Sequence, residues 1–293
     1  MILVVGSTGR IGRALLGRLS GAGVPVRSMV RSPAKASRID HERIDVVHGD
    51  LADPTSLSKA VTGVEAVFLL SSPHPRQVEL QGNAIRAALA AGVRRIVKLS
   101  AAGAGPGAPA GLIRWHSETE RDIEDSGLAF THLRPTGFMQ NTLASAASVA
   151  AEGVIRGTQG GGRVAWIDAR DVAAVAAEVL LGSGHDGKAY EITGPALLSQ
   201  SDLADRIAVA IGRPVEYVDV PEPEMRQRLI DAGMPAWLAD EVLALAAWWR
   251  ADGDAHVTDG VAGLTGAEPR TFEAFAREFA HRFVGREAGT SDH

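Results

Sequence analysis

The chain of 293 residues contains no cysteine, which excludes disulfide bonds, thiolate metal sites and a thiol nucleophile. It has no apolar run of transmembrane length and no cleavable signal segment at its start, so we expect a cytoplasmic protein without membrane contact. The net charge of −5 disfavours a surface that binds nucleic acid. Hydrophobic residues make up 45% of the chain, which is enough for a substantial buried core.

The start of the chain combines an apolar strand, a glycine loop and a helix. Ile2–Val5 runs directly into Gly6-Ser-Thr-Gly9-Arg-Ile-Gly12, and a helical stretch follows. Gly6 permits a tight turn, Gly9 lets the backbone approach a pyrophosphate, and Gly12 allows close packing of helix and strand. This order predicts a dinucleotide-binding βαβ unit. The predicted cofactor contacts are Gly6, Ser7, Thr8, Gly9, Arg10, Ile11 and Gly12.

Short apolar runs alternate with helical patterns through the first half, which predicts a parallel sheet. The expected strands are 2–5, 26–30, 45–48, 66–70, 95–99 and 129–133, and the expected helices are 10–20, 54–61, 75–91 and 113–126. The fold class is therefore α/β, with a doubly wound parallel Rossmann sheet and a smaller, mainly helical C-terminal substrate lobe. We expect an NAD(P)-binding domain over 1–135, with a strand near 189–193 as a candidate addition, and an interleaved substrate lobe over 136–284. Residues 285–293 are expected to be a disordered tail.

The second half shows weaker periodicity. The expected helices are 172–181, capped by Asp171, and 201–211, 223–232, 235–249 and 271–283. Gly157–Gly162 is either a mobile loop or a tight turn. Trp248 and Trp249 belong either to the core, which we favour, or to a dimer face, so the chain is a monomer or a homodimer.

The end of the second strand indicates which nucleotide is bound. NAD enzymes usually place an acidic residue there for the ribose 2′-hydroxyl, and the segment Val26–Pro33 contains none. Arg31 stands where a 2′-phosphate would lie, with Ser32 and Arg10 as further contacts, and a guanidinium pairs well with phosphate. The sequence therefore predicts NADP(H).

The ends of the fourth and fifth strands meet at the same edge as the glycine loop, because carboxyl ends of parallel strands point one way. Leu70, Ser71 and Ser72 follow the fourth strand, and Ser100 and Ala101 follow the fifth. We expect these residues to line the nicotinamide-ribose side of the cofactor.

The helix after the fifth strand carries the candidate catalytic residues. His116 and Glu120 are four residues apart and share one helix face. His116 is the expected proton donor, with Glu120 raising its pKa and fixing its ring, although a solvated helix pair is the alternative. Trp115 is placed to stack on a flat substrate. The other histidines do not cluster, so no metal is predicted, and Asp168 and Asp171 are expected to brace a helix.

These motifs together resemble one known family. The segments that carry the resemblance are Gly6–Gly12, Trp115–Glu120, Leu133–Asn141, Ile167–Ala173 and Tyr190–Pro195. They are similar to the NmrA-like branch of atypical short-chain dehydrogenase/reductases. The resemblance implies that Asp50 accepts a hydrogen bond from the adenine and that Leu51 packs on it. It also implies that Pro135, Thr136 and Gly137 lie beside the nicotinamide, with Phe138 and Asn141 near the substrate.

Ordinary short-chain dehydrogenases use a Tyr-x-x-x-Lys pair, and this chain lacks one, because neither Tyr190 nor Tyr217 has a lysine four residues on. Without that proton donor, an acceptor that takes hydride readily is favoured. We therefore expect an NADPH-dependent reductase of a small quinone, enone or imine. The alternative is a non-catalytic, NADP(H)-sensing regulator that binds a protein partner, since regulators of this family also lack the tyrosine. A sugar-nucleotide epimerase is disfavoured by the missing pair.

Overall fold

The computed structural model describes residues 1–36, 39, 44–109 and 111–285, and the expected tail at 286–293 lies outside them. The chain forms two compact units. The first comprises Met1–Pro135, Ala169–Ile192 and Asp259–Ala267, and the second comprises Thr136–Asp168, Thr193–Thr258 and Glu268–His293. Both units therefore contain segments that are far apart in the sequence.

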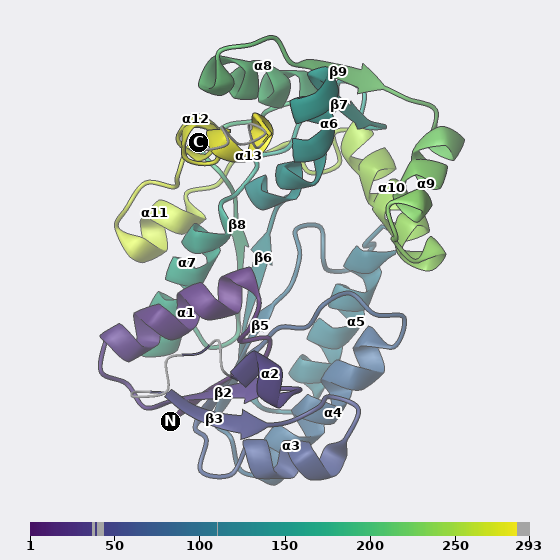
Figure 1. The fold of residues 1–293 in the computed structure, drawn as a ribbon. Helices are drawn as coiled ribbons and strands as arrows, with labels where there is room; N and C mark the ends of the chain where they lie inside the picture. The colour runs from purple at the N-terminus through teal and green to yellow at the C-terminus, as the bar shows by residue number, and fades with distance from the viewer. Residues whose placement is uncertain (37–38, 40–43, 110, 286–293) are drawn as a thin grey trace, which may run out of the picture. The chain divides into compact units, whose positions relative to one another are not determined.

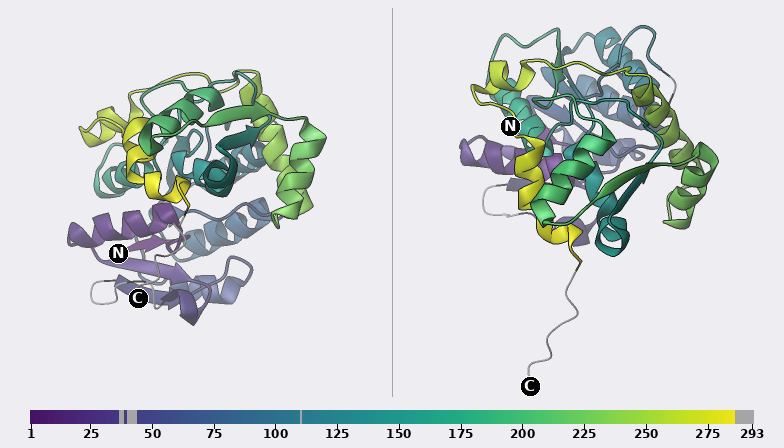
Figure 2. Two further views of the ribbon diagram at one scale, coloured as in Figure 1. Left: turned by 45° about the horizontal axis from the view of Figure 1, so that its top comes forward. Right: turned by 90° about the horizontal axis from the view of Figure 1, so that it is seen from above.

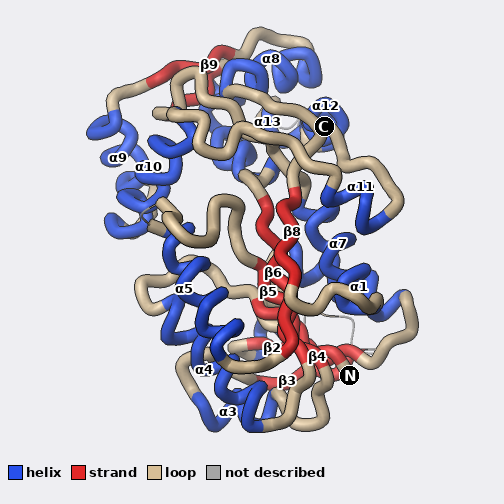
Figure 3. The backbone as a smooth tube through the Cα atoms, turned by 180° about the vertical axis from the view of Figure 1, so that it is seen from behind, coloured by secondary structure: helices blue, strands red, loops and turns tan. Residues whose placement is uncertain are grey.

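The first unit is built on a seven-stranded parallel sheet with the order β3-β2-β1-β4-β5-β6-β8. Figure 1 shows the unit, and Figure 3 shows its strands from behind. The strands are β1 (Ile2–Val4), β2 (Val26–Val30), β3 (Ile44–His48), β4 (Ala66–Leu69), β5 (Arg95–Leu99), β6 (Ala129–Pro135) and β8 (Lys188–Ile192). Strands β1 and β4, in the middle of the sheet, consist of apolar residues only, as expected where both faces are covered. The Rossmann prediction is confirmed, and the late strand joins the sheet next to β6.

Helices cover both faces of this sheet. The first unit contains α1 (Arg10–Gly21), α2 (Pro33–Ala36), α3 (Pro54–Ala60), α4 (Gln77–Ala90), α5 (Leu112–Asp125), α7 (Ala169–Leu181) and α11 (Gly260–Thr265). Helices α1 and α7 pack together on one face, while α3, α4 and α5 form a row on the other (Figure 1). Ile85, Ile96 and Ile123 belong to the buried core between this row and the sheet. Each of the strands β1 to β5 is followed by a helix, and the carboxyl ends of these parallel strands lie at one edge of the sheet.

The second unit is mainly helical around its own core, which includes Trp166, Trp249 and Phe275. Its elements are η1 (Met139–Ser145), α6 (Ala146–Glu152), β7 (Val154–Gly157), α8 (Gln200–Ile211), β9 (Glu216–Asp219), α9 (Glu222–Asp231), α10 (Ala236–Arg250), α12 (Phe272–Glu278) and α13 (Ala280–Phe283). Helix α8 packs against α12 and α13, and α9 packs against α10 (Figure 2). Strands β7 and β9 pair in parallel as a separate two-stranded sheet, which the sequence analysis did not predict.

The glycine-rich segment Gly157–Gly162 is a tight turn fixed by neighbouring side chains. Tyr217 Oη accepts hydrogen bonds from the backbone N–H of Gln159 at 3.0 Å and of Gly160 at 3.2 Å. Gly162 passes so close to α10 that a Cβ would lie 2.1 Å from Trp249 O. Of the two alternatives, the structure therefore supports the turn.

Three local expectations need correction or resolution. Asp171 does not cap its helix, because α7 begins at Ala169 and places Asp171 in the first turn. The helix expected over 271–283 is interrupted at Phe279, which ends α12 and precedes α13. Trp249 is only 9% exposed and belongs to the core of the second unit, as we favoured.

Within the described residues, no helix combines the length and apolar character needed to cross a membrane.

Candidate active site

The glycine loop between β1 and α1 has the close contacts that the spacing predicts. Gly6 has a φ of +73°, and a Cβ there would meet Leu70 O at 2.6 Å. A Cβ on Gly12 would meet Gly6 O at 2.3 Å, so the helix and the loop touch through backbone atoms. Gly9 is the N-cap residue of α1 and is exposed, and because it has no side chain it offers no capping hydrogen bond to the first helical turn. Its outer side and the N–H groups of the first helical turn are therefore open to an anion.

The side chain of Ser7 faces into the protein. It is fully buried, donates to Met29 O at 2.8 Å and accepts from Ser28 Oγ at 2.8 Å. These hydrogen bonds tie the glycine loop to β2. The side chain of Ser7 therefore shapes the loop, and the cofactor contact expected of this residue stays a prediction.

Two exposed arginines stand at the expected phosphate positions. Arg10 is the first residue of α1, and Arg31 directly follows β2. Neither forms an ion pair with any acidic residue in the part of the chain that the structure describes. Both guanidinium groups are therefore available to a ligand at this edge of the sheet, beside the half-buried Ser32. The residues present fit a phosphorylated dinucleotide.

Asp50 and Leu51 follow β3 at the same edge. Asp50 Oδ1 accepts from Ala52 N at 2.9 Å, and Asp50 N donates to Ser56 Oγ at 2.9 Å, so the residue also stabilises its own turn. Leu51 is half-buried against the core below. The adenine role that the resemblance implies for both residues stays a prediction.

The residues after β4 and β5 lie along this edge as expected. Ser71 Oγ accepts a hydrogen bond of 2.8 Å from Gln81 Nε2, while Leu70 is half-buried and Ser72 is exposed. Ser100 N donates to Leu133 O at 2.7 Å, and Ala101 is half-buried. These positions are compatible with contacts to a bound cofactor, which stay predictions.

A polar cluster lies between α5 and the sheet. The sequence pattern predicts its two residues on α5 but not its three residues on the strands. Lys98 on β5 pairs in register with His132 on β6, and Arg134 follows two residues later on the same face. His116 and Glu120, one turn apart on α5, face these strands. The ammonium of Lys98 lies 2.9 Å from His116 Nδ1. Charged residues inside an inner strand were the available signal, because such side chains are rarely buried without a partner.

Glu120 pairs with Arg134 and does not contact His116. Arg134 Nε donates to Glu120 Oε1 at 3.0 Å and Nη2 donates to Oε2 at 2.6 Å, while the carboxylate is 3% exposed. Burial is the largest single effect and opposes ionisation of Glu120, but several favourable interactions, led by the hydrogen bonds from Arg134, together lower its pKa. The expectation that Glu120 orients His116 and raises its pKa is wrong. Burial and the nearby Lys98 charge lower the pKa of His116 well below its usual value.

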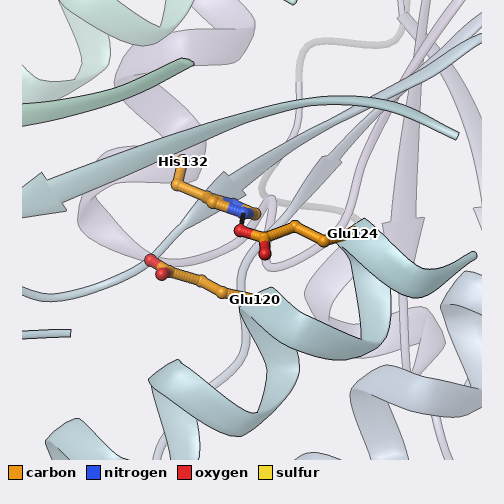
Figure 4. Close-up of side chains that lie close together, drawn as sticks. All are labelled: Glu120, Glu124 and His132. Atoms are coloured by element: carbon orange, nitrogen blue, oxygen red, sulfur yellow. Dashed lines mark hydrogen bonds and ion pairs between the residues drawn. The ribbon is translucent and has the colours of Figure 1, made fainter. Parts of the chain in front are cut away.

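Glu120, Glu124 and His132 form one group whose ligand atoms all lie within 4.8 Å of one another. Figure 4 shows the two carboxylates on successive turns of α5, pointing toward the strand of His132. His132 Nε2 lies 3.2 Å from Glu124 Oε1, and Arg134 already occupies both oxygens of Glu120. We therefore interpret the group as a network of hydrogen bonds and the Arg134–Glu120 ion pair, and the prediction of no metal stays a prediction.

The segment after β6 divides between the units. Pro135 ends β6, whereas Thr136, Gly137, Phe138 and Asn141 belong to the second unit. Thr136 Oγ1 donates to Ala165 O at 2.5 Å, and a Cβ on Gly137 would lie 2.8 Å from the Trp166 ring.

Phe138 is half-buried and pairs with Ile167 in a β-bridge, while Asn141 is exposed on η1. Trp115 is half-buried on α5 in the first unit. The nicotinamide and substrate contacts expected of these residues stay predictions.

Comparisons with known proteins show the family of the chain. A sequence model described as NAD(P)H-binding matches residues 6–182. The chain is 39% identical over 283 residues to an NAD(P)H azoreductase of Xenophilus azovorans, covering 97% of this chain and 99% of that protein. It is 38% identical over 285 residues to a (4-alkanoyl-5-oxo-2,5-dihydrofuran-3-yl)methyl phosphate reductase of Streptomyces griseus, with 97% and 99% covered.

Among solved structures, the chain is similar to the NADPH-dependent quinone oxidoreductase QOR2 of Escherichia coli complexed with NADPH. The TM-score is 0.88 at 32% sequence identity, and the match covers 95% of this chain and 99% of that one. The fold and these relatives define an NAD(P)H-dependent oxidoreductase. More closely, the chain belongs to the NmrA-like, NAD(P)H-binding family of atypical short-chain dehydrogenase/reductases, as its motifs predict.

Proposed function

We propose that this protein uses NADPH to reduce a small, conjugated, electron-poor acceptor, such as a quinone, an enone or an imine, without a tyrosine–lysine pair. The observation that carries the proposal is the position of His116. Its Nδ1 is taken by Lys98, so its other ring nitrogen is left to act on a substrate. Relatives at 38–39% identity are reductases, which favours turnover over the alternative of a non-catalytic sensor.

Both tyrosines have structural partners instead of a catalytic lysine. Tyr190 Oη lies 2.9 Å from His185 Nδ1, and Tyr217 Oη donates to Asp219 Oδ1 at 2.9 Å. Burial and the Asp219 carboxylate raise the pKa of Tyr217 to about 12, which makes it a poor acid near neutral pH. These contacts support a mechanism in which neither phenol donates the proton.

The glycine loop would hold the pyrophosphate, and Arg31 with Arg10 would hold the 2′-phosphate. Bound NADPH supplies the hydride. The relative that was crystallised with NADPH supports this choice of cofactor. Neither arginine pairs with a described acidic residue, so no such ion pair has to break when the two side chains bind the phosphate.

His116 would then stabilise the negative charge that reduction leaves on the acceptor. A neutral imidazole can do this by hydrogen bonding to a developing oxyanion. Because the pKa of His116 lies well below its usual value, the ring is neutral at physiological pH. A carbonyl acceptor needs such a donor, whereas an N-alkylated iminium ion needs none, since hydride alone neutralises it.

The test is NADPH oxidation by His116→Ala with one quinone, one enone and one N-alkylated iminium ion. We expect kcat to fall about 100- to 1,000-fold with the quinone and the enone, as for loss of one oxyanion donor, and to change little with the iminium ion. His281→Ala, an exposed histidine on α13, is the matched control. Equal kcat for wild type and His116→Ala with all three acceptors would refute the role of His116. Wild type that turns over no acceptor but distinguishes NADP⁺ from NADPH would favour the sensor.

A further inference from the structure

The ammonium of Lys98 is buried without a carboxylate partner. Lys98 is among the largest fully buried side chains and lies on β5, between β4 and β6. It donates to Leu99 O at 3.1 Å and lies 2.9 Å from His116 Nδ1, and it forms no ion pair in the described ranges of the chain. Lysines are almost never fully buried unless paired, so this arrangement needs a chemical explanation.

We propose that Lys98 positions His116 and that it supplies, through the His116 imidazole, the proton that completes reduction of the acceptor. The inference rests on the proposed function, because it extends the hydrogen bond that His116 makes to the reduced acceptor into delivery of a proton. An ammonium has only donors, so His116 Nδ1 is the acceptor, and the ring hydrogen resides on Nε2. Lys98 therefore sets the tautomer that presents an N–H to a substrate.

The surroundings of Lys98 allow it to release a proton near neutrality. His116 and Glu120 face it from α5, His132 and Arg134 stand beside it on β6, and β4 contributes only the apolar Leu69 at that register position. Burial lowers the pKa of Lys98 to about 7, and the Glu120 charge opposes the shift only in part. Both forms of Lys98 are then populated near pH 7.

The proposed step balances as two coupled proton transfers. The Nε2–H bond of His116 breaks as an O–H bond forms on the reduced acceptor, while an Nζ–H bond of Lys98 breaks as an Nδ1–H bond forms. The ammonium becomes an amine, and the imidazole stays neutral with its tautomer reversed. A solvent proton then enters at Nε2 and reverses both transfers. The two electrons of the reduction come with the hydride, so the relay moves protons only.

The first test needs no turnover. Long-range ¹H–¹⁵N spectra of the ligand-free protein, with His116→Gln to assign the signal, report the His116 tautomer. We expect the Nε2–H form at pH 6, a change in the Nδ1 shift with a midpoint near pH 7 as Lys98 deprotonates, and no imidazolium. Lys98→Met should abolish the change near pH 7 and raise the pKa of His116. An Nδ1–H form in wild type at pH 6, or an unchanged spectrum in Lys98→Met, would overturn the proposal.

The second test is the pH profile of kcat with the quinone. Wild type should lose activity as pH rises through the Lys98 pKa, whereas Lys98→Met should lose about 10- to 100-fold near pH 6 and show no such decline. Lys98→Arg keeps the positive charge but cannot release its proton. It should therefore keep the Nε2–H tautomer of His116, and its kcat should not decline as pH rises. Lys59→Met, an exposed lysine on α3, is the matched control.

The two proposals fail in different ways. If His116→Ala reduces the quinone as wild type does, the proposed function of His116 fails whatever the spectra show. If His116→Ala is inactive while Lys98→Met keeps the wild-type pH profile and tautomer, only the relay is refuted. Because the wild-type titration is itself decisive, poor folding of a Lys98 variant does not prevent the test.

Discussion

Three glycines, one directly before α1 and two within it, allow an effect on cofactor binding to be separated from an effect on stability. A Cβ on Gly17 would meet nothing within 4 Å, and a Cβ on Gly9 would approach only Gly6 O, at 3.3 Å. A Cβ on Gly12 would lie 2.3 Å from Gly6 O and 2.6 Å from the Cα of Ser7. Alanine at these positions should therefore give three different results.

Gly17→Ala should stabilise the protein by about 1 kcal/mol, because alanine replaces glycine inside an exposed helical stretch. Gly12→Ala should cost about 1–3 kcal/mol, since both close contacts are backbone atoms and the helix must move away from the loop. Gly9→Ala should leave the ligand-free protein near wild type, because its φ of −75° suits alanine. Its methyl group would project from the exposed face of the loop, so NADPH affinity should fall about tenfold, or 1.4 kcal/mol.

The assay is thermal unfolding of the ligand-free variants, followed by calorimetric titration with NADPH. Gly17→Ala should raise the midpoint by about 2–4 °C and leave the dissociation constant unchanged. Wild-type affinity in Gly9→Ala would refute the assignment of this loop to the pyrophosphate. Wild-type stability in Gly12→Ala would show that the close approach of α1 to the loop is not required.

Three further predictions concern single contacts. Arg31→Ser should weaken NADPH binding about 10- to 100-fold and NADH binding far less, and equal losses in the two titrations would contradict a 2′-phosphate role. Glu120→Gln should lower the thermal midpoint at pH 7, because it leaves the Arg134 guanidinium unpaired. The pKa of Glu120 is lower in the folded than in the unfolded protein. Its contribution to the free energy of unfolding is therefore fully present above the unfolded pKa of about 4.3 and is lost as pH falls through the folded pKa. The stabilities of wild type and Glu120→Gln should accordingly converge in acid. Tyr217→Phe removes the acceptor of the Gln159 N–H, whereas the Gly160 N–H keeps Asp219 Oδ1 at 3.0 Å, and thermal unfolding should show a loss of about 1 kcal/mol with unchanged NADPH affinity.

The strands of the Rossmann sheet were predictable because their physical signal is local. Strands β1 and β4 consist of apolar residues only, and burial of both sheet faces leaves few alternatives for such segments. The expected strand 95–99 has the bounds of β5, and 2–5 exceeds β1 by one residue. Strand β6 continues to Pro135, two residues past the expected end, because its last residues pair with β8. That pairing depends on a strand more than fifty residues away.

The second unit was less predictable because its strands carry a weak signal. In β9, which runs from Glu216 to Asp219, no residue is buried, and the segment reads as polar. Its pairing with β7 is set by contacts between distant segments. A run of helical periodicity likewise could not reveal the interruption at Phe279, where the backbone leaves helical geometry between two short helices.

The candidate site shows why spacing alone misassigned a partner. The four-residue spacing of His116 and Glu120 places them on one helix face but does not say which strand residues lie opposite. The register of β5 against β6 decides this, because it places Lys98 beside His132 and sets Arg134 one step further along the same face. Arg134 takes both oxygens of Glu120, and Lys98 is left with His116 Nδ1. A buried lysine and a buried carboxylate would ordinarily pair, so the arginine that occupies the carboxylate makes the lysine available for proton transfer.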